Sequence, residues 1–465
     1  MFQKSIYKDR RSVLKSNVGS GLIILLGNEE SPMNFKDNTY HFRQDSTFLY
    51  YFGINDPNLV GIIDVDANNE FIVGDELSID AIVWMGRQTT LKEKSAAAAI
   101  DVVLPSKDFS SIISNALDAK RKIHFLPPYR GENKIKLSGL LGKSIIEVEN
   151  GASVDLIKAV VKQRSHKAPE EVAELDKAVT LSAEMHKMVM QFAKPGMSEN
   201  AIAAAIQEYA LNHANGLSYP AILTVNGHIL HNHYHGNTLK SGQMVLNDSG
   251  VETKMGYAGD LTRTFPVDKK FTSLQREMYE IILNAHKHAI SLLSPAVRYL
   301  DIHFESCKML ATGLKEFGLM KGNVDDAVAA GAHALFFQCG TGHMMGLDVH
   351  DMEDLGEQYV GYTETLKKNT DTFGLKSLRL GKQLEPGFVL TVEPGLYFIP
   401  ELIEMWSAKG MFKEFINYDK LEKLRDFSGI RIEDNFLITE NGYQLLGKPL
   451  EIEIEDVEAI RATAY

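Results

Sequence analysis

Carboxylate side chains stand inside strand-like strings in the second half of this 465-residue chain. Asp248 ends the string VLND, Asp260 lies in GYAGDLTRTFPV, and the polar run SGVETKMG lies between the two aspartates. Two strand-like runs around such a polar segment predict a hairpin of antiparallel strands. Both carboxylates can then face the same side of that hairpin.

Two glutamates follow the same pattern nearer the C-terminus. In TVEPG, Pro394 is expected to stop the strand ladder directly after Glu393. In GIRIEDNFLIT, the alternation of a strand places Arg431 and Glu433 on one face and the isoleucines on the other. A charged pair that faces inward from a strand needs a partner such as a metal.

One histidine completes the set. His343 lies in GTGHMMGLDVHD, where small residues allow a close approach of the backbone to its neighbours. Four carboxylates carry a charge of minus four, which two divalent cations would cancel, leaving one neutral imidazole and room for a bridging water or hydroxide. Each residue alone fits a turn, a solvated strand end or a packing role. The five side chains together would suit a dinuclear metal site and metal-assisted hydrolysis, an interpretation that is favoured because their strings also resemble those of one known family.

The strings around these residues resemble those of a known family. GYAGDLTRTFPV, GHMMGLDVHD, LEPGFVLTVEPGLYF and SGIRIEDNFLIT are similar to the metal-site strings of the aminopeptidase P and prolidase branch of the pita-bread metallopeptidases. These enzymes cleave the bond between any residue and a following proline. The resemblance implies that Asp248 and Asp260 chelate the metals, that Asp260 and Glu433 bridge them, and that His343 and Glu393 complete the shell of one metal.

The resemblance also implies substrate-side and catalytic residues. His231 in NGHILHN and His350 in LDVHD match two substrate-side histidines of the family. Glu393 is the candidate for moving a proton, and His350 for stabilising the oxyanion. Arg379 lies 393 − 379 = 14 residues before Glu393, where prolidase-like dipeptidases carry an arginine that binds the terminal carboxylate of the substrate. A surface arginine at the end of a loop is the alternative interpretation.

Two departures from the family pattern stand out. The two aspartates are 260 − 248 = 12 residues apart, whereas relatives usually place them eleven apart. Relatives also commonly carry histidine at the position of Cys339, four residues before His343.

The run GHILHNHYHGN could be a separate zinc site, but it lacks cysteine or glutamate partners and is better explained as a polar rim of the active site. Its histidines are His228, His231, His233 and His235.

The expected fold class is α/β, with two domains. Short apolar runs separated by turn residues predict an N-terminal α/β domain with a mixed sheet, residues 1–160, similar to the non-catalytic domain of aminopeptidase P. Residues 161–465 are expected to form the pita-bread catalytic domain. There, one predicted helix begins at Pro169 and another at the capping box of Thr272 and Gln275. Pro195 and Pro295 end these two helices 100 residues apart, which indicates a weak internal repeat.

The name of the activity stays open between two alternatives. The long stretches on either side of Glu393 resemble prolidases, which slightly favours an Xaa-Pro dipeptidase, with an Xaa-Pro aminopeptidase for longer peptides nearly level. A non-catalytic binding module or a creatinase-like hydrolase is disfavoured because all five ligand positions are intact. The expected cofactors are two divalent ions, with manganese first and cobalt, iron or zinc also compatible with four oxygen ligands and one imidazole.

Composition limits the partners. A net charge of −12 without a basic cluster argues against nucleic acid and anionic membranes. Cys307 and Cys339 are the only cysteines, which does not suit a disulfide framework. The apolar patch at residues 22–26 is too short for a signal peptide and predicts a buried strand. We therefore expect a cytoplasmic enzyme acting on small proline-containing peptides, and, from the resemblance, a homodimer or homotetramer.

Overall fold

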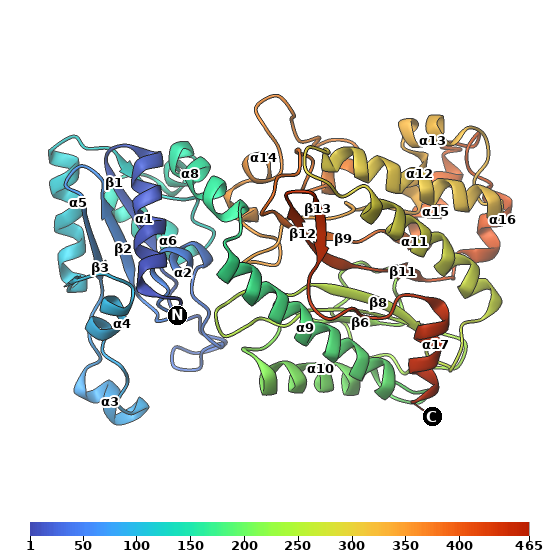
Figure 1. The fold of residues 1–465 in the computed structure, drawn as a ribbon, viewed down its shortest axis with the longest axis horizontal. Helices are drawn as coiled ribbons and strands as arrows, with labels where there is room; N and C mark the ends of the chain where they lie inside the picture. The colour runs from blue at the N-terminus through green and yellow to red at the C-terminus, as the bar shows by residue number, and fades with distance from the viewer. Residues whose placement is uncertain (465) are drawn as a thin grey trace. The chain divides into compact units, whose positions relative to one another are not determined.

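The computed structural model describes residues 1–464 (Figure 1). They divide into two compact units. The first unit comprises Met1–Arg164 and Met352–Tyr359, and the second comprises Ser165–Asp351 and the residues from Val360 onward.

A mixed five-stranded sheet forms the centre of the first unit. The order is β4-β3-β2-β1-β5, with antiparallel pairing among the three central strands and parallel pairing at both edges. The strands are β1 (Leu22–Leu26), β2 (Val60–Asp64), β3 (Asn69–Val73), β4 (Val102–Leu104) and β5 (Ile123–His124). The apolar patch predicted as a buried strand is β1, and its first four residues are buried. The predicted mixed sheet is confirmed.

Helices cover this sheet because its two faces are apolar. Phe109, Ile113 and Ala116 of α5 (Phe109–Asp118) pack on a cluster that includes Leu22 and Ile62. In Figure 1, α5 and α1 (Lys4–Val18) flank the sheet. The other α-helices that begin in this unit are α2 (Ser46–Phe52), α3 (Ile79–Met85), α4 (Leu91–Ala97), α6 (Gly131–Leu141), α7 (Ile145–Glu149), α8 (Val154–Ser165) and α14 (Glu357–Val360).

Two helix pairs organise the second unit. The first pair is α9 (Pro169–Phe192) with α10 (Glu199–His213), and the second is α11 (Ser273–Ser291) with α12 (Tyr299–Phe317). Pro169 stands at the first helical position of α9, as predicted. The predicted capping box of Thr272 and Gln275 opens α11. Antiparallel strands follow each pair along the chain (Figure 1), which is the element order that the weak internal repeat predicts.

The strands of the second unit form three small sheets, ordered β6-β7-β8, β13-β12-β9 and β10-β11. An isolated bridge between Thr262 and Glu433 links the first of these sheets to the segment between β11 and β12. The strands are β6 (Ile222–Thr224), β7 (Met244–Ser249), β8 (Leu261–Pro266), β9 (Val389–Val392), β10 (Gly395–Tyr397), β11 (Gly429–Arg431), β12 (Asp434–Thr439) and β13 (Gly442–Leu445). The remaining α-helices are α13 (Val324–Ala330), α15 (Pro400–Ala408), α16 (Tyr418–Leu421) and α17 (Ile454–Ala462).

One strand expectation needs correction. The string GIRIEDNFLIT reads as a single strand, but the structure divides it into β11 and β12. The chain changes partners at this point, because β11 pairs with β10 whereas β12 pairs with β9 and β13. The predicted alternation survives the break: Ile430 and Ile432 are fully buried, whereas Arg431 and Glu433 line a cavity.

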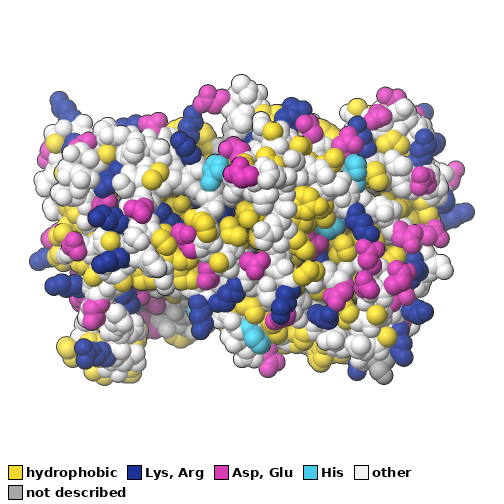
Figure 2. All heavy atoms as spheres, viewed as in Figure 1, with side chains coloured by type: hydrophobic (Ala, Val, Ile, Leu, Met, Phe, Trp, Pro, Cys, Tyr) yellow, Lys and Arg dark blue, Asp and Glu magenta, His cyan; other side chains and the backbone are white. Residues whose placement is uncertain are grey.

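The surface of the molecule gives little information about its partners. In the part of the chain that the structure describes, no helix is long and apolar enough to cross a bilayer. On the face shown in Figure 2, lysines and arginines are interspersed with aspartates and glutamates.

Candidate active site

The hairpin predicted around the two aspartates is present. Strands β7 and β8 pair antiparallel, with Asp248 opposite Thr262. Asp248 lies within β7, and Asp260 directly precedes β8. Gly259 lets the base of the hairpin lie against α9, since a Cβ there would be 2.5 Å from Ser182 Oγ. Both carboxylates line the same cavity, so the hairpin turns them to one side as expected.

Neighbouring strands hold Asp260 and Glu433 in place. Asn435 brackets Asp260, because its side chain accepts from the Asp260 amide at 3.2 Å and donates to the Asp260 carbonyl at 2.5 Å. Thr262 accepts from the Glu433 amide through its carbonyl at 3.1 Å and donates its hydroxyl to Glu433 Oε2 at 2.7 Å. The buried Arg263 donates to the Glu433 carbonyl at 2.7 Å. These contacts hold the backbone of both residues and the Glu433 carboxylate in place.

His343 is positioned against β9. Its amide donates to Thr391 Oγ1 at 3.1 Å, and its carbonyl accepts from the Thr391 amide at 3.0 Å. This close pairing requires Gly342, because a Cβ there would lie 2.2 Å from the Thr391 carbonyl oxygen. His343 Nδ1 lies 3.0 Å from the Met344 carbonyl oxygen. A proton on Nδ1 donated to that carbonyl leaves the Nε2 lone pair directed into the site, as in a metal-binding histidine.

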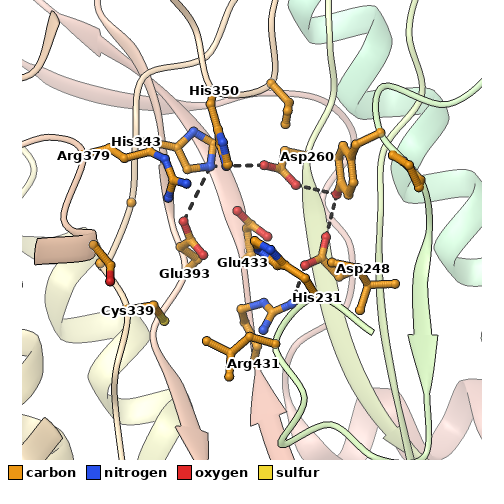
Figure 3. Close-up of a pocket in the computed structure, with 18 of the residues that line it drawn as sticks. His231, Asp248, Asp260, Cys339, His343, His350, Arg379, Glu393, Arg431 and Glu433 are labelled. Atoms are coloured by element: carbon orange, nitrogen blue, oxygen red, sulfur yellow. Dashed lines mark hydrogen bonds and ion pairs between the residues drawn. The ribbon is translucent and has the colours of Figure 1, made fainter. Parts of the chain in front are cut away.

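The five residues predicted as metal ligands converge (Figure 3). His343 Nε2 lies 3.3 Å from Asp260 Oδ2 and 3.5 Å from Glu393 Oε1. Asp260, His343 and Glu433 each offer one ligand atom within 4.8 Å of the others, and all three are buried. Asp248 and Glu393 line the same cavity. Figure 3 shows Glu433 at the centre of the group, between Glu393 and Asp248.

Burial shapes the protonation of the carboxylates. Burial raises the pKa of Glu393 to about 7, against the lowering effects of His343 and Arg431. It also raises the pKa of Glu433 well above its usual range, with the charges of Asp260 and Glu393 adding to the effect. The pKa of Asp248 is raised by burial as well. Without cations, the site therefore holds protons at pH values where ordinary carboxylates are ionised.

Asp260 and His343 behave as an ion pair. Burial opposes ionisation of Asp260, but hydrogen bonding to His343 outweighs it and lowers the pKa of the carboxyl. Burial likewise opposes protonation of His343, but hydrogen bonding to Asp260 and the charge of Glu393 raise the pKa of the imidazole. In the protein alone, a proton on His343 thus occupies a place that a cation could take.

The residues fit divalent cations. Glu433 Oε1 is buried and has no hydrogen-bond partner among the described residues, which is costly for a carboxylate oxygen unless a ligand satisfies it. Four carboxylates and one imidazole form a donor set typical of manganese, iron, cobalt or zinc. The site thus combines an orphaned oxygen with a matching set of ligands.

The predicted substrate-side residues line the same cavity, which has a volume of about 200 Å³. The ring of His350 meets that of His343 edge to face, with centroids 4.4 Å apart. Arg379 is half-buried, and His231 is exposed. Cys339 also lines the cavity, and its Sγ lies 4.0 Å from the Tyr397 hydroxyl.

The histidine run divides into two groups. His233 lines the cavity beside His231, which agrees with a polar rim, whereas His228 and His235 are not among the lining residues.

Two cavity residues that contact the predicted carboxylates were not themselves predicted as site residues. The Tyr219 hydroxyl lies 2.6 Å from Asp248 Oδ1 and 2.5 Å from Asp260 Oδ1, so it connects the two aspartates. Arg431 donates to Asp248 Oδ2 and, at 2.8 Å, to the Tyr397 hydroxyl. The strand alternation placed Arg431 beside Glu433 and could have indicated its role. No pattern in the sequence around Tyr219 points to the site.

Comparison with known proteins identifies the family. Residues 173–440 match the model of metallopeptidase family M24, and residues 7–124 match the model of the aminopeptidase P N-terminal domain. The chain belongs to metallopeptidase family M24. The resemblance read from the metal-site strings is confirmed, and so is the fold class, a mixed-sheet N-terminal domain followed by a pita-bread domain.

Relatives in this family carry two names. The chain is 30% identical over 455 residues to the Xaa-Pro dipeptidase of Homo sapiens, covering 95% of this chain and 88% of that protein. It is also 30% identical over 476 residues to the Xaa-Pro aminopeptidase of Escherichia coli strain K12, covering 98% of each. These two similarities do not distinguish a dipeptidase from an aminopeptidase.

Solved structures of the family agree with the fold over the whole chain. A variant of Escherichia coli aminopeptidase P superposes with a TM-score of 0.82 at 29% identity, covering 100% of this chain and 99% of that one. A zinc-substituted form of the same enzyme in complex with product gives a TM-score of 0.81 at 29% identity over the same shares of the two chains.

Proposed function

We propose that this protein is a dinuclear-metal exopeptidase that hydrolyses the bond between a residue and a following proline. The observation that carries the proposal is the convergence of Asp260, His343 and Glu433 on one buried point of a cavity that also contains Arg379 and His350. In this proposal residues 161–465 form the catalytic domain and residues 1–160 a non-catalytic domain. Relatives named Xaa-Pro dipeptidase and Xaa-Pro aminopeptidase support the substrate class.

The substrate class has a physical logic. The bond before proline is a tertiary amide without an N–H group, so proteases that hold substrates as extended strands lose a hydrogen bond there. A separate type of site is therefore needed for such bonds. A cavity of about 200 Å³ lined by both polar and apolar side chains suits a short peptide with a proline ring.

The proposed cofactors are two divalent ions, manganese first. Cobalt, iron or zinc would also suit the donor set. The five residues that line the cavity, Asp248, Asp260, His343, Glu393 and Glu433, would hold the ions. Bound there, the two ions would lower the pKa of a water and polarise the scissile carbonyl.

Proton transfer, oxyanion stabilisation and substrate binding would be carried out by side chains of the protein. Glu393 would take and return a proton during hydrolysis, since its carboxylate lines the cavity and its Oε1 lies 3.5 Å from His343 Nε2. His350 would stabilise the developing oxyanion, and its ring is held against His343 at 4.4 Å between centroids. His231 and Arg379, which line the cavity, would bind the substrate.

We favour the dipeptidase slightly because Arg379 lines the same cavity as the ligands. A guanidinium there can bind the terminal carboxylate of a dipeptide. The Xaa-Pro aminopeptidase is the second candidate, since relatives of that name are as similar. The test compares hydrolysis of an Xaa-Pro dipeptide with that of an Xaa-Pro-Xaa tripeptide in the presence of manganese. Faster cleavage of the dipeptide supports the first name, faster cleavage of the tripeptide supports the second, and cleavage of neither contradicts the proposed function.

The proposal extends to the setting of the enzyme. We propose a cytoplasmic homodimer or homotetramer that acts on small proline-containing peptides and has no nucleic-acid or membrane partner. The net charge of −12 agrees with the last point, since it repels nucleic acid and anionic lipid. Light scattering after size-exclusion chromatography tests the oligomeric state.

A further inference from the structure

A second group of metal-binding side chains lies in the same unit, apart from the cavity of the carboxylates. His303 and Cys307 stand one turn apart on α12, and His333 comes from the short turn Ala332–Leu335. Each of the three offers one ligand atom within 4.8 Å of the others. Residues four apart on a helix share a face, so α12 presents its two ligands together.

The group is buried in an apolar environment. His303 is 1% exposed, Cys307 is 0% exposed and His333 is 6% exposed. The ring of Phe337 lies 5.9 Å from that of His303 between centroids. None of the three residues lines the cavity of the proposed active site. The group therefore needs an explanation of its own.

Hydrogen bonds within the group are incomplete. His303 Nδ1 lies 2.9 Å from Thr341 Oγ1, and His303 Nε2 lies 3.6 Å from Cys307 Sγ. In contrast, His333 Nδ1 is buried and has no hydrogen-bond partner among the residues described. A buried imidazole nitrogen without a partner is costly, and a bound cation would satisfy it.

The geometry already suits coordination. Metal–nitrogen distances of about 2.0 Å and metal–sulfur distances of about 2.3 Å place ligand atoms roughly 3.3 to 3.8 Å apart. The separation of 3.6 Å between His303 Nε2 and Cys307 Sγ is within this range. A His303 proton on Nδ1, donated to Thr341, would leave Nε2 free to bind, as ligand histidines usually do. Small rotations would bring His333 into the same shell.

The donor set and its surroundings select the ion. One thiolate and two imidazoles form a soft donor set, which Cu(I) and zinc prefer over magnesium, calcium or manganese. Burial alone lowers the pKa of His333 to about 4, without a charged partner. For His303, burial and the neighbouring His333 lower the pKa to about 3. With no carboxylate acting on these imidazoles, a divalent ion bound to one thiolate would leave a buried net charge, whereas a monovalent ion would leave none.

We propose that His303, Cys307 and His333 form a buried site for a monovalent soft cation, Cu(I), separate from the dinuclear site. Binding replaces the thiol proton: Cu(I) forms a bond to Cys307 Sγ, one proton leaves to solvent, and no electron is transferred. The bound complex is electrically neutral. It would tie α12 to the turn Ala332–Leu335 and, through Thr341, to the segment that carries His343.

The test uses the full chain with the carboxylate site disabled by Asp260→Asn and Glu433→Gln. Cu(I) is titrated without oxygen against a chromogenic Cu(I) chelator. We expect one equivalent per chain, bound about 100-fold more weakly after Cys307→Ser. The matched control is Cys339→Ser, which removes the other cysteine and should leave binding unchanged. His333→Gln should also weaken Cu(I) binding. This second variant tests the site independently if Cys307→Ser misfolds.

Two further measurements examine the ligands and the proton. X-ray absorption should give one sulfur and two nitrogen neighbours at about 2.0 to 2.3 Å. The affinity for Cu(I) should rise about tenfold for each unit by which the pH is raised, as long as the pH stays below the thiol pKa, because binding releases one proton. Equal binding by the Cys307→Ser chain, loss of binding in Cys339→Ser, or binding of one equivalent of zinc but no Cu(I) would each overturn the proposal. Because no arm measures peptidase activity, failure here is distinct from failure of the proposed function.

Discussion

At the residue scale, Arg379 separates the two leading names for the activity. If its guanidinium binds the carboxylate of a dipeptide, Arg379→Ala leaves that charge unpaired, at a cost of about 1.5 to 3 kcal/mol. We expect catalytic efficiency on Xaa-Pro to fall roughly ten- to a hundredfold, and efficiency on Xaa-Pro-Xaa to fall much less. Steady-state kinetics with both peptides measure this. The control is Arg298→Ala, which removes an exposed arginine paired with Asp301. Equal losses on both peptides would favour the aminopeptidase.

Glu433 provides the residue-scale test of the metal centre. Its Oε1 is buried without a partner in the described chain, and its Oε2 is held by Thr262 at 2.7 Å. The wild-type protein should bind two manganese ions per chain after loading, and Glu433→Ala should bind fewer and lose turnover while keeping its fold. Elemental analysis, peptide hydrolysis and circular dichroism check the three outcomes. Glu440→Ala, an exposed glutamate beyond β12, is the control. Wild-type activity in the Glu433 variant would remove this residue from the site.

At the element scale, the segment carrying His343 depends on its close approach to β9. A Cβ on Gly342 would lie 2.2 Å from both the Thr391 carbonyl oxygen and the Tyr299 hydroxyl. Gly342→Ala should therefore push this segment away from β9 and destabilise the protein by about 1 to 3 kcal/mol, with weaker manganese binding. Chemical denaturation and metal titration measure the two effects. Gly139→Ala is the control, since a Cβ there meets nothing within 4 Å. An unchanged affinity would show that Gly342 does not position His343.

Local patterns predicted the elements that carry the site. Polar residues between two apolar runs gave the hairpin of Asp248 and Asp260, and alternation placed Arg431 beside Glu433. Such patterns report which face a side chain occupies, but not its partner from a distant strand. The contact of Tyr219 with both aspartates, and the change of partner between β11 and β12, depend on long-range pairing and had no local signal.

The same limit applies to the second group of potential ligands. Cys307 and His303 are four residues apart, which is readable as a shared helix face, but His333 lies on a separate turn. Only the folded structure brings His333 within reach of the other two. The sequence likewise does not show that these polar ligand atoms lie in an apolar environment.

At the scale of the whole molecule, buried histidines should govern stability in mildly acidic solution. Burial lowers the pKa of His186, His286 and His333 to about 4 and, with His333 nearby, that of His303 to about 3. In the unfolded chain these imidazoles take up protons near pH 6.5. In the folded chain they take up protons only near pH 3 to 4. Stability should therefore fall as the pH drops from about 6.5 toward 4. Urea denaturation of the metal-free protein across this range measures the slope, and a flat profile would contradict it.

Above pH 6.5 the carboxylates of the site should reverse this trend in the metal-free protein. The folded pKa of Glu393, about 7, and that of Glu433 lie above the value of 4.5 for an ordinary glutamate. A raised folded pKa stabilises the protein below the unfolded value, and this stability is lost as the pH rises through the folded value. The loss begins near pH 4.5, where it offsets part of the histidine effect, and above pH 6.5, where these histidines are neutral in both states, it leaves a net decline without metal that manganese should remove. The double variant Glu393→Gln and Glu433→Gln should remove the decline, because amides do not ionise; a decline that persists in it would assign the effect to other groups.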